Sequence, residues 1–321
     1  DGFGGFVDLL CHQQNGERGR QRILRGGINM KANKQFKRAS IGLEWKKQIR
    51  LLPGHIIVGA WCLFTIAMLG WIVAASLSTS PEIMRGKALA FESGFHFENY
   101  VNAWSANNIS VFFANSLLYA LCAMCGSILI SAPAAYVLAR FVFKGNSIVR
   151  SGFITAMSIP QIMIVLPLFS LATQANLTGS KVVLIFIYIG MQIPYTTTFL
   201  ITFFSNLSRV YEEAAAIDGC PPMQTFWKIM LPLAQPGLVT VGIFNFMGIW
   251  NEYFLSLIFA SSEKNMSVGP GLKSVLTAMQ YTGDWGGLFA AVVIVFLPTL
   301  LLFICLSRTI ISGITAGGVK G

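Results

Sequence analysis

The sequence has 321 residues, of which 54% are hydrophobic and only 11% are charged, and its formal net charge is +10 at pH 7. A soluble globular domain has about 25% charged residues, so this composition excludes an ordinary soluble enzyme or binding domain. The mean hydropathy of +0.63 indicates instead a chain that lies largely within a membrane.

Residues 1–29 differ from the rest of the chain. They are rich in Gly, Gln and Arg, show no helical or strand periodicity, and contain no apolar run that could form the core of a cleavable signal peptide. The first methionine is Met30, so we expect the native chain to begin there and residues 1–29 to be an extension. A disordered or amphipathic cytoplasmic arm is the alternative. Residues 30–52 form a basic segment, of a kind that usually faces anionic lipid rather than nucleic acid.

Six apolar runs follow, and each is longer than the ~20 residues that an α-helix needs to cross the hydrocarbon core. They cover roughly residues 53–77, 111–139, 148–172, 181–204, 236–260 and 288–310. A buried soluble core does not need six such runs, so we predict an all-α, polytopic membrane protein with six transmembrane helices over residues 53–321. Cys122 and Cys125 form a CxxC in the second run, but no loop or further ligand accompanies them, so no metal site is expected.

The distribution of basic residues predicts the orientation. Cytoplasmic segments carry an excess of Lys and Arg. With both termini in the cytoplasm, 18 of the 23 basic residues lie on that side and five on the other. We therefore predict cytoplasmic termini, outer loops at residues 78–110 and 261–287, and a cytoplasmic loop at residues 205–235.

Proline and glutamine occur together in the third and fourth runs. Pro160 and Pro167 lie in the third run and Pro194 in the fourth. A proline inside a helix removes one hydrogen bond and kinks the helix by steric clash. Kinked helices beside Gln161 and Gln192 would line a cavity, which makes these two residues candidates for a translocation path. Kinks that only aid packing are the alternative.

The fifth run contains Glu252, the one carboxylate within the six runs. Asn245, Glu252 and Ser256 are spaced i, i+7 and i+11, so on a continuous helix they share one face. A carboxylate in hydrocarbon is costly and usually faces the bundle interior or water. We predict a role for these three residues in the path or its gate; a salt bridge or helix contact is the alternative.

The cytoplasmic loop is predicted to form two short helices joined at a sharp corner. Ser208 is suited to cap the first helix, and Gly219 supplies the left-handed residue that ends it. Pro221 and Pro222 cannot continue that helix but suit the start of the next one, and Pro232 is expected to stop the second helix. The loop contains no nucleophile–base pair, metal-ligand spacing or phosphate-binding pattern, so we interpret it as a docking knob. An ordinary amphipathic loop helix is the alternative.

The same loop resembles the signature loop of bacterial ABC-importer permeases. The pattern Glu-Ala-Ala, Gly, Ile, Leu-Pro occurs with the family's spacing, and an Asp precedes the Gly. The C-terminal "GITAGGVKG", "WNEY" in the fifth run and "AAYVLARF" in the second resemble permeases of the maltose-permease type, which more often have Ala where Gly318 stands. By this resemblance the residues that couple to an ATPase are Glu212, Glu213, Ala214, Ala215, Asp218, Gly219, Ile229, Leu231 and Pro232.

The resemblance implies a non-enzymatic half-channel in the bacterial cytoplasmic membrane that imports a sugar or oligosaccharide. Its implied partners are a second homologous permease, two ABC ATPase subunits that bind ATP and magnesium, and an extracytoplasmic solute-binding protein. The sequence contains no G-x-x-x-x-G-K-[ST] pattern, so ATP must bind to another chain. An importer of polyamines, amino acids or anions is the first alternative. An ion-coupled transporter is a remote one, because it would need several intramembrane ionisable groups.

The outer loop at residues 261–287 is long and glycine-rich, and "LKSVLTAMQY" within it is expected to form a short amphipathic helix. Loops of this length are usually functional or disordered, and its aromatic residues favour function. By resemblance to sugar permeases it meets the docked binding protein; a plug over the pore mouth is the alternative. The contact candidates are Lys273, Gln280, Tyr281 and Trp285.

Overall fold

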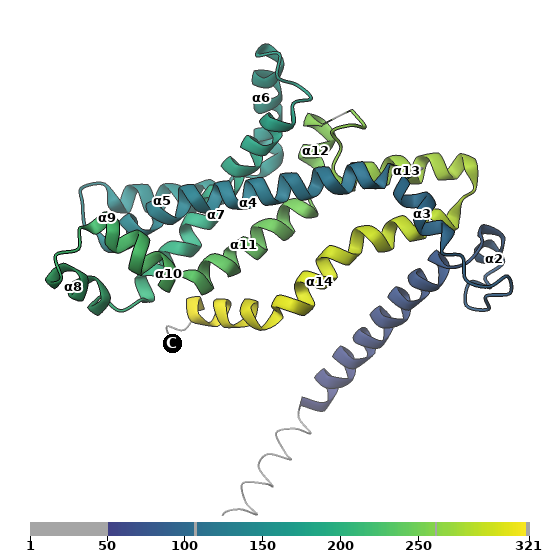
Figure 1. Cartoon of the computed structure of the whole chain (residues 1–321), viewed down its shortest axis with the longest axis horizontal. Helices are drawn as coiled ribbons and strands as arrows, with labels where there is room; N and C mark the ends of the chain where they lie inside the picture. Colours follow the sequence, from purple (N-terminus) through teal and green to yellow (C-terminus); the bar gives the residue numbers. More distant parts are fainter. Residues whose placement is uncertain (1–50, 106–107, 261, 319–321) are drawn as a thin grey trace, which may run out of the picture. The chain divides into compact units, whose positions relative to one another are not determined.

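The structure, a computed structural model, describes residues 51–105, 108–260 and 262–318. The predicted extension at 1–29 and almost all of the basic segment at 30–52 lie outside the described residues. Across the described residues the regular structure is helical, with no strand. By its internal contacts the chain divides into two units, Asp1–Leu69 and Gly70–Gly321. All helices labelled in Figure 1 belong to the second unit.

Four described helices are long and apolar enough to cross a membrane, and two bent helix pairs raise the number to six if each pair counts as one span. The four are Leu51–Ser76, α4 (Ile109–Arg140), α7 (Lys181–Asn206) and the first part of α14 (Trp285–Gly318). The prediction of an all-α, polytopic membrane protein is therefore confirmed.

The third apolar run, residues 148–172, is not one continuous helix. Helix α5 (Asn146–Met157) and helix α6 (Gln161–Gln174) meet at an angle of 94°. Pro160 precedes α6 in an extended conformation, with φ −60° and ψ 129°, and the residue before a proline is disfavoured in helical geometry. The predicted kink is thus a complete break, after which α6 turns away from α4 and α7 (Figure 1).

The fifth run is also broken. Helix α11 (Gln235–Trp250) ends two residues before Glu252, and the short helix α12 (Phe254–Phe259) follows after three intervening residues. Ser256 therefore lies on a different helix from Asn245. The predicted common face of Asn245, Glu252 and Ser256 is wrong, because the i, i+7, i+11 spacing assumed one uninterrupted helix.

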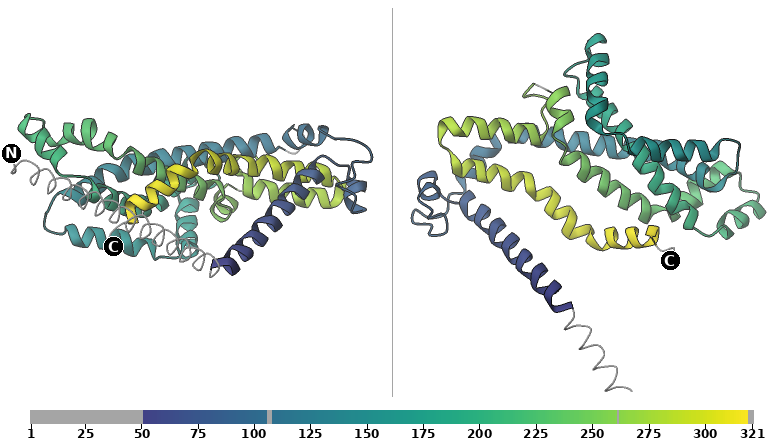
Figure 2. Two further views of the ribbon diagram at one scale, coloured as in Figure 1. Left: turned by 90° about the horizontal axis from the view of Figure 1, so that it is seen from below. Right: turned by 180° about the vertical axis from the view of Figure 1, so that it is seen from behind.

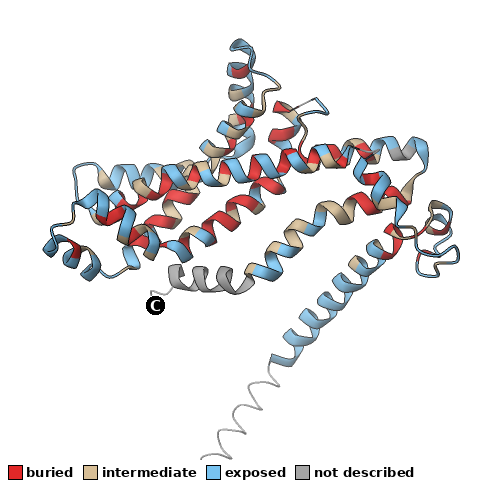
Figure 3. Cartoon of the chain, viewed as in Figure 1, coloured by how far each residue is buried: buried red, intermediate tan, exposed pale blue. Residues whose placement is uncertain are grey.

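The core lies where α4, α7 and α11 pack together, and buried residues line these three helices (Figure 3). Small residues permit the close approach. A side-chain carbon at Gly237 would lie 2.6 Å from the Phe203 ring, so only glycine fits at this crossing of α11 and α7. Asn245, fully buried, donates from its amide to Ser127 of α4 at 3.0 Å and to Thr196 of α7 at 2.8 Å. The three helices are thus joined by both packing and polar contacts.

Three further helices belong to the segments predicted as outer loops. They are α2 (Ser80–Met84), α3 (Glu98–Ser105) and α13 (Val268–Thr282). Helix α13 contains the segment "LKSVLTAMQY", so the helix predicted there is confirmed and is longer than expected. A cluster of buried apolar residues joins α3, the start of α4, α13 and the start of α14.

Candidate functional site

The loop at residues 205–235 forms the corner that the sequence predicts. Helix α8 (Val210–Ile217) ends at Gly219, whose φ of 72° is in the left-handed region. The N–H of Cys220 donates to the Ala215 carbonyl at 2.9 Å, which is the bond expected where a left-handed glycine closes a helix. Pro222 then starts helix α9 (Pro222–Thr225). The left-handed role predicted for Gly219 is confirmed.

The start of α8 differs in detail from the prediction. The residue at the N-cap is Arg209, with helical φ −69° and ψ −18°, rather than Ser208. The Ser208 hydroxyl still accepts a hydrogen bond from the Val210 N–H at 3.3 Å, so it serves the first turn from one position further out. Glu212 and Glu213 lie in that first turn, where the helix dipole favours anions.

Pro232 does not stop the second helix of the loop. After α9 the chain continues as a π-helical turn, η1 (Phe226–Met230), and as α10 (Leu231–Leu233). The Leu231 N–H donates to the Phe226 carbonyl, five residues earlier. This wider turn directly precedes Pro232, which could not donate to a regular helical ladder. The helical path bends only at Ala234, where Pro222–Leu233 meets α11 at 71°.

The loop is fastened to the end of α4 by Arg140, a residue that the sequence analysis used for the orientation and, within "AAYVLARF", for the family resemblance, but not as a contact of the loop. Its guanidinium Nη2 donates to the Leu207 carbonyl at 2.8 Å, and its Nε lies 3.4 Å from Oε2 of Glu212. The Arg140 side chain is only 5% exposed and that of Glu212 is 20% exposed. The sequence does contain one indication of this contact. The second apolar run ends with the arginine of "AAYVLARF", on the side of the membrane where the loop with Glu212 and Glu213 is also predicted.

The remaining predicted coupling residues divide by exposure. Ala215 is buried, and Ile229 and Leu231 pack against the buried cluster of α4, α7 and α9 to α11. The predicted coupling residues that are exposed are Glu213, Ala214, Asp218, Gly219 and Pro232. Ile217 is 86% exposed and Met223 69% exposed, so the corner also presents two apolar side chains that the sequence interpretation did not single out. The corner lies beyond the ends of α4 and α7 (Figures 1 and 2).

A cleft of about 320 Å³ separates α8 from the end of α4. Basic, acidic and aromatic side chains share its wall, and they include the Arg140–Glu212 pair. The lining residues are Tyr136, Arg140, Phe141, Arg209, Glu212, Glu213, Ala216, Cys220, Pro222 and Thr225.

The predicted path residues do not form one cluster. Asn245 is buried between α4 and α7, whereas Gln161 is exposed at the start of α6. Gln192 of α7 is partly buried beside Gly248 of α11. Glu252 accepts hydrogen bonds from three donors around the break between α11 and α12. The structure thus places Asn245 in a helix contact, which was the alternative role.

The predicted contact residues of the second outer loop also differ in their placement. Lys273 is exposed, and Tyr281 is 88% exposed. Trp285 is partly buried and packs against the cluster of α3, α4 and α13, while its N–H donates to the Ser80 hydroxyl at 2.9 Å. The side chain of Gln280 lies outside the described residues.

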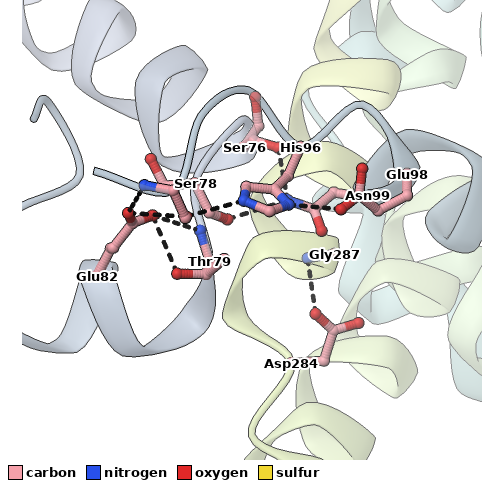
Figure 4. A network of polar contacts seen from close by, with 10 residues as sticks. Ser76, Ser78, Thr79, Glu82, His96, Glu98, Asn99, Asp284 and Gly287 are labelled. Atoms are coloured by element: carbon pink, nitrogen blue, oxygen red, sulfur yellow. Dashed lines mark hydrogen bonds and ion pairs between the residues drawn. The ribbon is translucent and has the colours of Figure 1, made fainter. Parts of the chain in front are cut away.

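A polar network holds the first outer loop together (Figure 4). Glu82 is 6% exposed, and its carboxylate accepts bonds from the N–H and hydroxyl groups of Thr79 and Ser93 at 2.9–3.0 Å. The bond from the Thr79 N–H, followed by those from Ser93, lowers the pKa of Glu82 to about 2. The Asn99 amide donates to the carbonyls of Ser76 and Ser78, each at 3.0 Å.

This first outer loop is joined to the start of α14 at Gly286. A side-chain carbon at Gly286 would lie 2.7 Å from both the Asn99 amide nitrogen and the Ser78 carbonyl oxygen. Only glycine fits there, so the end of the first apolar run, α3 and the last span meet at one tight junction.

Together, the long apolar helices, the two bent helix pairs and the protruding corner define a multi-pass membrane protein. The chain belongs to the family of binding-protein-dependent transport system inner membrane components, whose model matches residues 127–314. It is a multi-pass protein of the inner membrane and a permease subunit of an ABC importer.

Several relatives are similar over most of their length. The diacetylchitobiose uptake system permease protein of Streptomyces coelicolor is 32% identical over 263 residues, which cover 82% of this chain and 87% of that protein. The sulfoquinovosyl glycerol transport system permease protein of Agrobacterium fabrum is 34% identical, with coverages of 78% and 87%. The trehalose/maltose transport system permease protein of Thermococcus litoralis is 28% identical, with coverages of 87% and 99%.

A solved structure has the same fold. One chain of a bacterial ABC transporter involved in the import of alginate matches with a TM-score of 0.70 and 20% identity, over 81% of this chain and 96% of that chain.

Proposed function

We propose that this chain is one of two permease subunits of an ATP-driven importer that takes up a sugar or oligosaccharide from a solute-binding protein. The corner of α8 and α9 carries the proposal, because Gly219, Arg140 and the exposed carboxylates together present a fixed surface for a cytoplasmic partner. The sugar assignment is supported by relatives whose names specify diacetylchitobiose, sulfoquinovosyl glycerol and trehalose or maltose.

In this proposal the corner docks in a cleft of an ABC ATPase subunit. Ile217 and Met223 supply apolar contact at its tip, while Glu213 and Asp218, both exposed, supply charge. Ala215, Ile229 and Leu231 fix the corner to the bundle rather than to the partner. The complete assembly comprises a second homologous permease, two ATPase subunits and an extracytoplasmic binding protein. ATP and magnesium bind to the ATPase subunits, so this chain supplies half of the pore but no catalytic residue.

The path for the solute lies between this chain and its partner permease. Gln161, which is exposed, and Gln192, which is partly buried, are the side chains proposed to line it. The exposed Lys273 and Tyr281 of α13 form part of the surface that meets the binding protein. In this proposal the binding protein delivers the solute at α13 on the outer side, and the ATPase acts at the corner of α8 and α9 on the cytoplasmic side. This difference between the two sides is compatible with transport in one direction.

The test is an in-frame deletion of this gene in the source organism, complemented from a plasmid. Uptake of radiolabelled di- and trisaccharides is measured alongside uptake of a polyamine, an amino acid and sulfate. We expect only saccharide uptake to be lost, and to return with the plasmid. Uptake in complemented cells should stop on ATP depletion by arsenate and persist with a protonophore while ATP is maintained. Loss of a non-sugar solute instead, or dependence on the proton gradient alone, contradicts the proposal.

A further inference from the structure

The break between α11 and α12 leaves the first N–H groups of α12 without partners in their own helix. Within a bilayer, water is not available to bond them, and each unsatisfied group is costly. Glu252 supplies the missing acceptors. Its Oε1 accepts from the Leu255 N–H at 2.7 Å, and its Oε2 accepts from the Ser256 N–H at 3.1 Å. This carboxylate therefore caps the first turn of α12 from one residue before the N-cap position, Tyr253.

The same carboxylate also joins α12 to α7. The hydroxyl of Tyr188 donates to Oε2 of Glu252 at 2.7 Å. Tyr188 is 2% exposed and lies in the first third of α7, so the bond is shielded from solvent. A hydrogen bond to a carboxylate is stronger than one between neutral groups. The position of α12 is thus tied to α7 at one buried point.

The segment that follows α12 is tied by polar side chains both to α12 itself and to α4. The Ser267 N–H donates to the Ser256 hydroxyl at 3.1 Å, and the Val268 N–H donates to the Ser116 hydroxyl at 2.8 Å. The Asn115 amide donates to the carbonyls of Lys264 and Met266 at 3.0 and 2.9 Å. We call residues 254–260 and 262–268, from α12 to the start of α13, the outer segment. Its backbone is held by polar side chains and leads directly into α13.

Helix α7 runs from this outer region to the coupling corner. It ends at Asn206, and α8 begins at Val210. Tyr188 therefore lies on the element that connects directly to the loop proposed to dock on the ATPase. The bond between Tyr188 and Glu252 is a physical link between the outer segment and that element.

We propose that Glu252 is a positioning residue of the transport cycle. Through Tyr188 its carboxylate holds the outer segment on α7, so that docking of the binding protein outside is transmitted to the coupling corner. The inference rests on the proposed function for its transport readout. It differs from the sequence interpretation, in which Glu252 lines the path, because here Glu252 acts through Tyr188 and the α12 cap rather than through contact with solute.

The test compares two tyrosine-to-phenylalanine variants on α7 in the reconstituted importer. Tyr188→Phe removes the hydroxyl that reaches Glu252 but leaves the ring and the α12 cap. Tyr195→Phe, the control, makes the same change on the same helix at a partly buried tyrosine for which no hydrogen bond is seen among the described residues. Glu252→Gln is the second variant, because it retains the side-chain size while weakening both the cap and the link.

We expect Tyr188→Phe to lower ATPase stimulation by the sugar-loaded binding protein roughly tenfold, the size expected when a hydrogen bond to a charged group is lost. Basal hydrolysis and the KM for sugar should not change, and Tyr195→Phe should behave like wild type. Combining Tyr188→Phe with Glu252→Gln should add little to the single changes. Unaltered stimulation overturns the inference, and so does an equal loss of basal and stimulated hydrolysis. A changed KM with intact stimulation would instead make the pair a solute contact.

A second readout requires no solute. Spin labels at Lys273 of α13 and Thr202 of α7, both exposed, report the distance between the two elements in the nucleotide-free complex. The distance distribution should broaden in Tyr188→Phe and not in Tyr195→Phe. An unchanged distribution in both variants overturns the inference. If no sugar stimulates the ATPase activity of the wild-type importer, the proposed function is contradicted. The distance measurement then still tests the link between Tyr188 and Glu252.

Discussion

The guanidinium of Arg140, the last residue of α4, lies 3.4 Å from the carboxylate of Glu212 in the first turn of α8. Arg140 also donates to the carbonyl of Leu207, directly before α8. Since α4 packs closely on α7, this side chain fixes both the entry to the corner and its first helical turn. The orientation of the proposed docking surface therefore depends on a residue 72 positions earlier in the chain, the difference between 212 and 140.

Replacement of Arg140 should consequently impair coupling more than membrane insertion. Arg140→Gln removes the charge beside Glu212 and leaves a shorter side chain to reach the Leu207 carbonyl. Hydrogen bonds to charged groups contribute about 1.5–3 kcal/mol, which is enough to release the corner but not to unfold the bundle. We expect normal amounts of protein in the membrane, reduced co-purification of the ATPase and loss of uptake. Lys144→Gln, at an exposed position near the same helix end, is the control; an equal defect there would remove the basis for this prediction.

Gly219 is required for its backbone conformation rather than for space. Its φ is 72°, and a side-chain carbon there would meet nothing within 4 Å. Gly219→Val should therefore cost about 1–2 kcal/mol locally, because a β-branched residue is strained in the left-handed region. We expect a protein that inserts normally, assembles poorly with its ATPase and does not transport. Gly219→Asn, which tolerates this conformation better, should retain much of the activity, and wild-type uptake in Gly219→Val would contradict the prediction.

The first outer loop should loosen when Glu82 is protonated. Its pKa is lowered from 4.5 to about 2 in the folded loop by bonds from Thr79 and Ser93. The ionised carboxylate therefore stabilises the loop fully above pH 4.5, and this contribution is lost as the pH falls through that value toward 2. Hydrogen exchange of residues 79–93, corrected for the intrinsic pH dependence, should show less protection at pH 2.5 than at pH 6.

The charge-neutral variant tests the same point at neutral pH. Glu82→Gln should speed tryptic cleavage after Arg85 in the purified protein at pH 7.5. The control is Glu92→Gln, which removes an exposed ion pair with Lys87 of a kind that contributes little. Equal cleavage rates in both variants would show that the buried carboxylate does not hold the loop.

The corner at Gly219 could be predicted because its causes are local. A helix-ending glycine followed by two prolines leaves the backbone few alternatives, and the structure has the expected left-handed residue and helix start at Pro222. The six apolar runs could also be identified from the sequence, since the hydropathy of a segment depends only on the amino acids that it contains. Neither inference needed knowledge of what the segments pack against.

The breaks and the buried polar contacts could not be predicted in this way. A proline such as Pro160 predicts a kink, but an angle of 94° depends on what α6 packs against. The interruption at residues 251–253 has no proline or glycine, and the cap that permits it is completed by Tyr188, 64 residues away in the sequence. The contact of Arg140 with Glu212 likewise joins two residues that are far apart in the sequence. In each case the decisive partner is distant in sequence, and pattern reasoning along one segment does not reach it.

The exposed face of α13 should be reached by the binding protein. Lys273 is exposed on this helix and Tyr281 is 88% exposed near its end, while the start of α13 is held on α4 through Ser116. A helix that is held at its start and has exposed side chains along it suits a surface that meets a docking partner.

Lys273→Cys and Tyr281→Cys should each cross-link to the binding protein in the assembled importer, and more strongly when ATP hydrolysis is trapped by vanadate. Lys228→Cys, exposed on the cytoplasmic corner in the proposed orientation, should not cross-link to it. If the α13 cysteines stay unlinked under trapping while Lys228→Cys links to the binding protein, the predicted orientation is reversed; if none links, α13 serves only to cover the outer mouth of the pore.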